Sequence, residues 1–250
     1  LVHKFIYSLV EPRRWDVVVF KNPQFVNQAD NSPGPTTNYI KRLVGLPGET
    51  IEILDGDVFI NGRIARKPNN VQRDLWMIVY DQAHVPEAGS PTGHRPRWVG
   101  IDLPDDKVPG WTGMQTRVMR YDGLDSVSRR LRFNYDAAPE YLLDFYAHNR
   151  RSSGTFVSDV RLTTDLVFAA GAGLCRLELS RAPYSFAAEL PRDGTVRLVV
   201  RNTGTDDPAV TLRSLSGPAF DAGAPHTVEF AHVDYRVYLR IDVCEDPATT

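Results

Sequence analysis

Cysteine and long apolar runs are scarce in this sequence, and each scarcity excludes a class of protein. Two cysteines in 250 residues provide no disulfide framework. The longest run of small and apolar residues, at 166–175, has about ten residues, whereas a membrane-spanning helix needs about 20. The formal net charge is −2, so the basic excess of a nucleic-acid-binding domain is missing and no nucleic-acid partner is predicted. With 42% hydrophobic and 24% charged residues, the composition is that of a soluble globular chain.

The histidines and glycines form no recognisable metal or phosphate motif. No H-x-x-x-H or H-E-x-x-H spacing occurs, and the two cysteines are far apart, so no structural zinc is predicted. His84 and His94 flank a stretch rich in Pro and Gly. The even spacing of His226 and His232 allows them to share one face of a strand, and we interpret both as polar surface positions. The sequence therefore implies neither a metal nor an organic cofactor.

Short apolar runs between turn residues predict a mainly β fold. In the second half of the chain, strands are predicted over 131–135, 141–147, 157–168, 174–180, 185–190, 195–201, 209–215, 226–232 and 233–243. Many short strands at close spacing are typical of an antiparallel β-sandwich or jelly roll.

Composition divides the chain into three segments: strand-rich residues 1–68, a Pro- and Gly-rich stretch at 69–115 that is either a connection or the first part of an insert, and the predicted β-sandwich at 116–250. Within the first segment, Asp16–Phe20 is a β-branched run typical of a strand buried on both faces. The dipeptides Asp55-Gly56 and Asn61-Gly62 predict tight turns between further short strands.

The informative stretch of the first segment lies at 38–49. Strand alternation places Lys41 on one face with Tyr39 and Leu43. A lysine on an apolar surface is desolvated, which lowers its pKa and allows a neutral amine to act as general base towards a serine hydroxyl. In the alternative interpretation, the stem of Lys41 lies on apolar surface while its ammonium stays in water.

Several motifs in residues 1–68 support the catalytic interpretation. In chain order they are V-H-K-F-I-Y at 2–7, R-R-W-D-V-V-V-F at 13–20, Y-I-K-R-L-V-G-L-P-G at 39–48 and D-V-F-I-N-G at 57–62. Together they resemble the bacterial type I signal peptidases, which are membrane-anchored serine proteases with a Ser-Lys dyad. Trp15 departs from the family pattern, which usually has Gly at that position.

The resemblance implies a role for each of six residues in and beside this stretch. Lys41 would be the general base, and substrate would be bound by Asn38, Tyr39 and Ile40. Strand addition is the implied mode, in which main-chain hydrogen bonds hold an extended peptide. Ordinary core packing is the alternative for Tyr39 and Ile40. Arg42 would bond an acidic residue of a later motif, and Asp16 would support the site.

Two family motifs do not occur in the 250 residues. The nucleophilic serine belongs to a Ser-Met-x-Pro motif, and none of Met77, Met114 and Met119 follows a serine. Ser8 lies in a different motif. The late Gly-Asp-Asn-Arg motif is also missing, because 125–129 has only a faint likeness to its end. We therefore expect a fragment that begins after the serine and ends before the last motif, with no dyad of its own.

By the same resemblance, the whole protein would lie in the cell membrane, held by an N-terminal anchor, with this portion on the extracytoplasmic side. Its substrates would be the signal peptides of exported pre-proteins.

The later segment would be a large insert similar to concanavalin- or laminin-G-like sandwiches, through the pattern at 226–230 followed by 235–242. Such an insert would bind a glycan or a protein, and a non-catalytic binding module is the alternative function. Cys175 and Cys244 would form a disulfide or remain two buried thiols.

Overall fold

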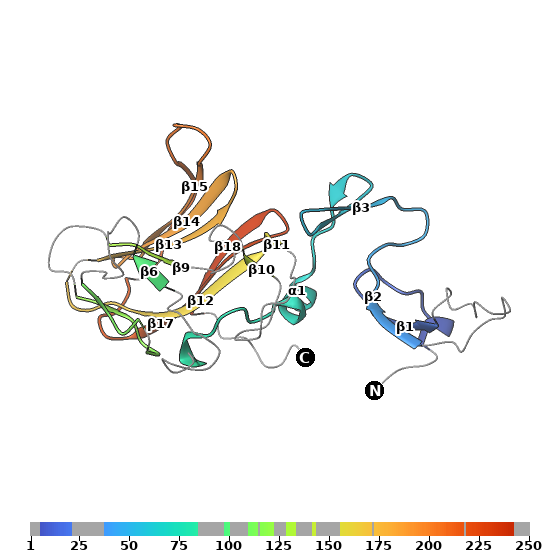
Figure 1. Cartoon of the computed structure of the whole chain (residues 1–250), viewed down its shortest axis with the longest axis horizontal. Coiled ribbons are helices and arrows are strands. Elements are labelled where there is room, and N and C mark those ends of the chain that lie inside the picture. Colours follow the sequence, from blue (N-terminus) through green and yellow to red (C-terminus); the bar gives the residue numbers. More distant parts are fainter. Residues whose placement is uncertain are drawn as a thin grey trace. The chain divides into compact units, whose positions relative to one another are not determined.

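The computed structural model describes residues 6–21, 38–84, 98–100, 110–114, 116–122, 129–133, 142–143, 156–171, 173–217 and 219–242. Most of the regular structure in these residues is antiparallel strand, which confirms the predicted mainly β fold (Figure 1). The chain divides into two compact units, residues 1–75 with 159–250 and residues 76–158. The predicted loop at 22–37, most of 85–109 and Cys244 lie outside the described residues. The three segments drawn from composition stay a prediction.

The first sheet is a two-stranded ribbon. A 3-10 turn at Ile6–Ser8 precedes β1 (Val17–Lys21), which pairs with β2 (Asn38–Arg42) in an antiparallel register. The expectation that Asp16–Phe20 is buried on both faces is wrong, since most of β1 is exposed. A β-branched run predicts a strand, whereas burial needs covering layers on both faces of the sheet. Among the described residues β1 pairs only with β2.

A small meander follows the ribbon. Strands β3 (Ile51–Leu54), β4 (Asp57–Ile60) and β5 (Arg63–Ile64) pair in sequence order. Both predicted tight turns are confirmed, because Asp55-Gly56 and Asn61-Gly62 have positive φ angles of 51°, 87°, 50° and 74° in turn order, as a type I′ turn requires. Helix α1 (Asn69–Leu75) comes next, with Val71 buried.

The second unit contains only short elements among its described residues. They are η2 (Gln82–His84), β6 (Trp98–Gly100), β7 (Trp111–Thr112), β8 (Arg120–Tyr121), β9 (Leu131–Phe133), β10 (Leu142–Leu143) and β11 (Phe156–Val157). The strands pair two by two, as β6 with β9, β7 with β8 and β10 with β11. Aromatic contacts accompany two of these pairs: Trp98 lies 5.5 Å from Phe133 between ring centroids, and Trp111 lies 5.3 Å from Tyr121.

Seven longer strands make up the rest of the first unit. One sheet contains β12 (Val160–Val167), β17 (Pro225–Val233) and β18 (Arg236–Ile241), in that order. The other is a four-stranded meander of β13 (Leu174–Arg181), β14 (Tyr184–Pro191), β15 (Thr195–Asn202) and β16 (Val210–Ser216). Every strand predicted from 157 onwards is present within a few residues of its expected bounds. The jelly-roll topology stays a prediction.

The two longer sheets share one hydrophobic core. Leu190 of β14 and Val228 of β17 are both 0% exposed, and Phe168 and Phe220 pack beside them with ring centroids 5.3 Å apart. Burying one such aliphatic side chain contributes about 1.5–3 kcal/mol. Partly buried side chains from β13, β15 and β18 surround this cluster, so both sheets depend on the same packing.

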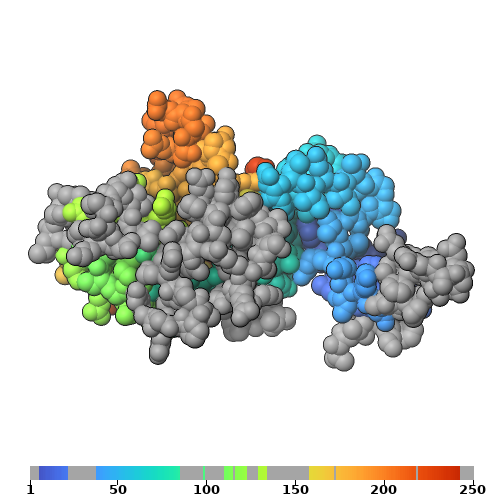
Figure 2. Space-filling model, viewed as in Figure 1, coloured from blue at the N-terminus to red at the C-terminus, as the bar shows by residue number. Residues whose placement is uncertain are grey.

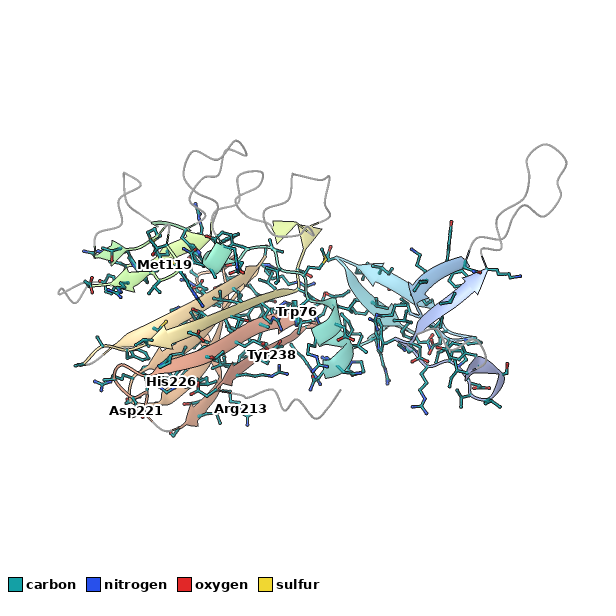
Figure 3. The ribbon with its side chains drawn as sticks, turned by 90° about the horizontal axis from the view of Figure 1, so that it is seen from below. Trp76, Met119, Arg213, Asp221, His226 and Tyr238 are labelled. Carbon is teal, nitrogen blue, oxygen red and sulfur yellow. The ribbon has the colours of Figure 1, made fainter. Side chains whose placement is uncertain are left out.

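The histidines of β17 are not surface residues, so that interpretation is wrong. His226, which is labelled in Figure 3, does lie on the face of β17 that also carries Val228, Phe230 and His232. His232 is 4% exposed and stacks on Phe186 at 4.9 Å. His226 Nδ1 is hydrogen-bonded to Asp242 Oδ2 at 2.6 Å. The even spacing identified their common face but not that this face points into the core.

The Cys175 thiol is free and mostly buried, and burial raises its pKa to about 11. The pairing with Cys244 is untested, because Cys244 lies outside the described residues. No helix in the described part of the chain is both long enough and apolar enough to cross a bilayer.

Candidate active site

Lys41 lies in the middle of β2, opposite Val18 of β1. Its ammonium is 6.0 Å from the centroid of the Tyr39 ring, so the two side chains share one face of the strand, as the alternation predicted. Lys41 itself is exposed. The desolvated setting that the pattern predicted is therefore wrong for the described structure, because no layer among the described residues covers this strand. The role of Lys41 as general base stays a prediction.

The three predicted substrate-binding residues line the exposed start of β2. Ile40 is 62% exposed and Tyr39 is 38% exposed, so neither is packed in a core. The Tyr39 ring makes one edge contact, with Phe20 of β1 at 6.2 Å. Asn38 pairs with Lys21 at the end of the ribbon. Within the described residues β2 has β1 as its sole strand neighbour, so its second edge can accept an added strand.

The two supporting residues, Asp16 and Arg42, tie the other end of the ribbon together. Arg42 Nη1 donates a hydrogen bond to the Trp15 carbonyl at 2.8 Å. Asp16 Oδ2 accepts hydrogen bonds from the Arg13 backbone N–H at 2.8 Å and from the Tyr7 hydroxyl at 3.4 Å. In the described structure Arg42 thus bonds a carbonyl, and the acidic partner implied by the resemblance stays a prediction.

Trp15 explains why a glycine is expected at its position. The φ angle of Trp15 is +76°, in the left-handed region. Glycine enters this region freely, whereas L-residues enter it at a cost of about 1–2 kcal/mol. The Trp15 N–H donates to the Leu43 carbonyl at 2.7 Å, which extends the ribbon by one more pair. The side chain is buried at 8% exposure, and its ring centroid lies 6.0 Å from Lys67 Nζ. Burial of the ring offsets the strained backbone.

A charged clamp that the sequence analysis missed holds the turn after β2. Arg14 Nη2 donates to Glu49 Oε1 at 2.5 Å, and Arg14 Nη1 donates to the Val44 carbonyl at 2.6 Å. Glu49 Oε2 accepts the Leu46 backbone N–H at 2.6 Å. The Arg14 hydrogen bond, followed by that of Leu46, lowers the pKa of Glu49. The glutamate directly after Pro47-Gly48 was the sequence signal for this clamp.

A second missed feature is a group of three aspartates, Asp57, Asp159 and Asp234, whose carboxylate oxygens lie within 4.8 Å of one another. Lys67 pairs with two of the three carboxylates, and Arg181 pairs with that of Asp57. No local motif connects these residues, since they are separated by up to 177 positions (234 − 57). The spacings of histidine and cysteine, which carry the usual metal motifs, give no sign of this group.

Comparison with known proteins finds a family that the N-terminal third of the chain resembles. Residues 1–87 match the family described as signal peptidase, peptidase S26. Signal peptidase I of Leptolyngbya laminosa is 40% identical over 63 residues, which cover 25% of this chain and 30% of that protein. Signal peptidase I P of Bacillus subtilis subsp. natto is 37% identical over 62 residues, covering 25% and 28%.

Signal peptidase I of Rickettsia akari (strain Hartford) is 42% identical over 53 residues, which cover 21% of this chain and 16% of that protein. The chain thus spans less than a third of the length of each of these relatives. No solved structure matches the chain significantly.

Proposed function

We propose that this chain, whose residues 1–87 match the signal peptidase family, serves the removal of signal peptides from exported pre-proteins by serine–lysine catalysis. One observation carries the proposal. Lys41 lies beside the exposed Tyr39 and Ile40 on a strand whose second edge has no strand partner among the described residues. An extended peptide added at that edge would run past the lysine.

In the proposed reaction, neutral Lys41 Nζ takes the proton from a serine hydroxyl as the serine oxygen attacks the peptide carbonyl. The resulting ammonium returns the proton to the leaving amine, and an ester to the serine remains. Water then hydrolyses the ester, with Lys41 again accepting a proton. The Ser-Met-x-Pro motif of that serine does not occur in the 250 residues, so Lys41 is the part of the dyad that this chain contributes.

The exposure of Lys41 bears on how the lysine becomes neutral. An ammonium in water favours its charged form, and removal of water is what lowers the pKa of a lysine. A peptide strand lying over Tyr39 and Ile40 would cover the neighbouring lysine with its own side chains. We therefore propose that bound substrate supplies part of the desolvation. The reaction needs neither a metal nor an organic cofactor, and its site is proposed to lie at the membrane on the extracytoplasmic side.

The experiment uses the complete gene product, reconstituted in lipid vesicles with a pre-protein substrate. The Lys41→Met variant should lose at least about 1000-fold in kcat/KM, because the serine would lack its base. Lys21→Met is the matched control, since Lys21 is an exposed lysine on the neighbouring strand, and its activity should equal that of the wild type. Cleavage by the Lys41→Met variant at the wild-type rate would refute the proposed role. The 250-residue chain alone should cleave nothing above background.

A second candidate is a non-catalytic binding module, favoured by the seven strands with their own shared core that make up most of the first unit. In that case the β-sandwich part would bind a glycan or a protein, and the peptidase-like segment would be its support. A glycan array separates the two functions. Specific glycan binding that is unchanged by Lys41→Met, in a protein that does not cleave the pre-protein, would favour the module. Binding of no glycan would argue against a lectin.

A further inference from the structure

Five charged side chains from distant parts of the chain meet inside the first compact unit. Asp57 opens β4, Lys67 follows β5, Asp159 precedes β12, Arg181 ends β13, and Asp234 lies in the turn between β17 and β18. They link the small β3–β5 meander to the two longer sheets. None of them belongs to the proposed peptidase site.

Lys67 and Asp234 form the centre of this group. The Lys67 ammonium forms an ion pair with Asp234 and lies 3.7 Å from Asp159 Oδ2. The Lys67 backbone N–H also donates to Asp234 Oδ2 at 2.9 Å, and Arg66 Nε donates to the Asp234 carbonyl at 3.3 Å. The Asp234 N–H in turn donates to Asp159 Oδ1 at 3.3 Å. The segment at 66–67 is therefore held by side-chain and backbone bonds to one turn.

Arg181 and Asp57 complete the group at the hairpin. Arg181 Nη2 donates to Asp57 Oδ2 at 2.9 Å, and the guanidinium lies 4.3 Å from the centroid of the Tyr235 ring. The Tyr235 ring also contacts Phe59 of β4, with centroids 6.0 Å apart. Asp57 is 0% exposed, and its Oδ1 has no hydrogen-bond partner among the residues that the structure describes. The charges are thus removed from water by aromatic and backbone neighbours.

Three carboxylates are crowded together in this group. Their oxygens lie within 4.8 Å of one another, and the cations beside them are Lys67, Arg181 and Arg66, whose Nε donates to the Asp234 carbonyl. Burial raises the pKa of Asp159 to about 6, and the charges of Asp57 and Asp234 raise it as well, while Lys67 and the Asp234 N–H lower it. A proton on Asp159 would remove one of the three crowded negative charges. The Lys67 ammonium pairs with two of the three carboxylates, those of Asp159 and Asp234.

We propose that these five side chains form a proton-operated latch between the β3–β5 meander and the β17–β18 turn, closed when Asp159 carries a proton and loosened when Asp159 is ionised. In the loosened state the negative charge of the partly buried Asp159 repels Asp57 and Asp234, and the contact of the Lys67 segment with the turn weakens. The latch is independent of peptidase chemistry, and it would set how firmly the meander is held against the longer sheets.

The direction of the pH dependence follows from the pKa of Asp159. Its value in the folded protein lies above its usual value of 3.8, so the folded latch binds more protons than the open form between these two values. The stabilisation is complete below the usual value and is lost as the pH rises through about 6. Between pH 5 and pH 7.5 the closed-to-open ratio should fall about tenfold.

Two measurements test the latch on the complete 250-residue chain. The first is an NMR titration of the Asp159 carboxyl carbon in the wild type, which should have a midpoint near 6. A midpoint near 4 would overturn the proposal, whatever the behaviour of any variant. The second is hydrogen exchange of backbone amides at 57–67 and 232–236, corrected for intrinsic rates, which should be about tenfold faster at pH 7.5 than at pH 5.

The variant Asp159→Asn keeps the side chain neutral at every pH. In this variant the corrected exchange rates at pH 7.5 and pH 5 should be equal. At pH 7.5 its amides should be at least as protected as those of the wild type at pH 5. Asp206→Asn is the matched control, since Asp206 is exposed in the loop between β15 and β16, which projects as an orange lobe in Figure 2. The control should keep the tenfold ratio. Equal exchange rates at the two pH values in the wild type would refute the latch. A tenfold difference between the two rates that is retained in Asp159→Asn would refute it as well.

Discussion

The Lys67 ammonium forms an ion pair with the Asp234 carboxylate, 167 residues further along the chain, and the side chains are only 11% and 5% exposed. The pair joins the peptidase-like segment to the hairpin of the longer sheets within one compact unit. In the interior, a charge that loses its partner is far more costly than a charge at the surface. Lys67 is therefore the residue whose removal tests how strongly these parts are joined.

Replacing Lys67 by Met should destabilise the first unit by about 3–5 kcal/mol, the range found when one partner of a buried pair is removed. Since Lys67 lowers the pKa of Asp159, the same change should move the Asp159 midpoint above 6. Urea unfolding, followed by amide exchange at 57–67, measures the first effect. Lys67→Arg keeps the positive charge and should recover most of the stability. Equal stability of Lys67→Met and the wild type would contradict a buried pair.

The shared core of the two longer sheets gives a second prediction. Leu190 is 0% exposed in the cluster with Val228 and Phe168, so Leu190→Ala should lower the free energy of unfolding by about 2–5 kcal/mol. Because both sheets contact this cluster, exchange should accelerate in β12 and β17 as well as in β14. Leu174→Ala is the control, since Leu174 is 58% exposed and its loss should cost less than about 1 kcal/mol. Acceleration confined to β14 would show that the sheets do not share one cooperative core.

The sequence predicted those features that depend on neighbouring residues. The strands from 157 onwards, the turns at Asp55-Gly56 and Asn61-Gly62 and the common face of Tyr39 and Lys41 all follow from alternation and turn chemistry. These signals are local, so a single sequence contains them in full. The predicted mainly β fold followed directly from their number and spacing.

Burial and long-range pairing could not be predicted in the same way. The β-branched residues of β1 identify a strand, but they do not specify whether other layers cover it, and β1 is exposed. His232 obeys the predicted alternation, yet only the position of the second sheet makes its face the inner one. The partnership of Asp57, Asp159 and Asp234 depends on how three distant segments meet, and a single sequence has no local sign of that meeting.

The bonds of Glu49 in the clamp lead us to expect that the stability of the turn after β2 depends on pH. The pKa of Glu49 is lowered, chiefly by the Arg14 hydrogen bond. The clamp is therefore intact at a pH above the usual glutamate pKa, and it is lost as the pH falls through the lowered pKa. Glu49→Gln should accelerate amide exchange at Leu46 at pH 7 and remove its dependence on acid pH. Glu52→Gln is the control on the neighbouring β3, whose residues are exposed. An unchanged Leu46 amide in Glu49→Gln would show that the clamp does not hold the turn.

Trp15 allows backbone strain and side-chain burial to be separated at one position. Both Trp15→Ala and Trp15→Gly remove the buried ring, a loss of about 3–5 kcal/mol, and both should destabilise the ribbon that carries Lys41. Only glycine relieves the strain of a φ of +76°. Trp15→Gly should therefore be more stable than Trp15→Ala by about 1–2 kcal/mol.

Urea unfolding measures both differences in stability. Amide exchange at Leu43 reports on the ribbon itself, because the Leu43 carbonyl and N–H bond Trp15 and Asp16. An alanine variant as stable as the glycine variant would mean that the backbone leaves the left-handed region once the ring is gone, and that the ring, rather than the turn, fixes the conformation next to the lysine strand.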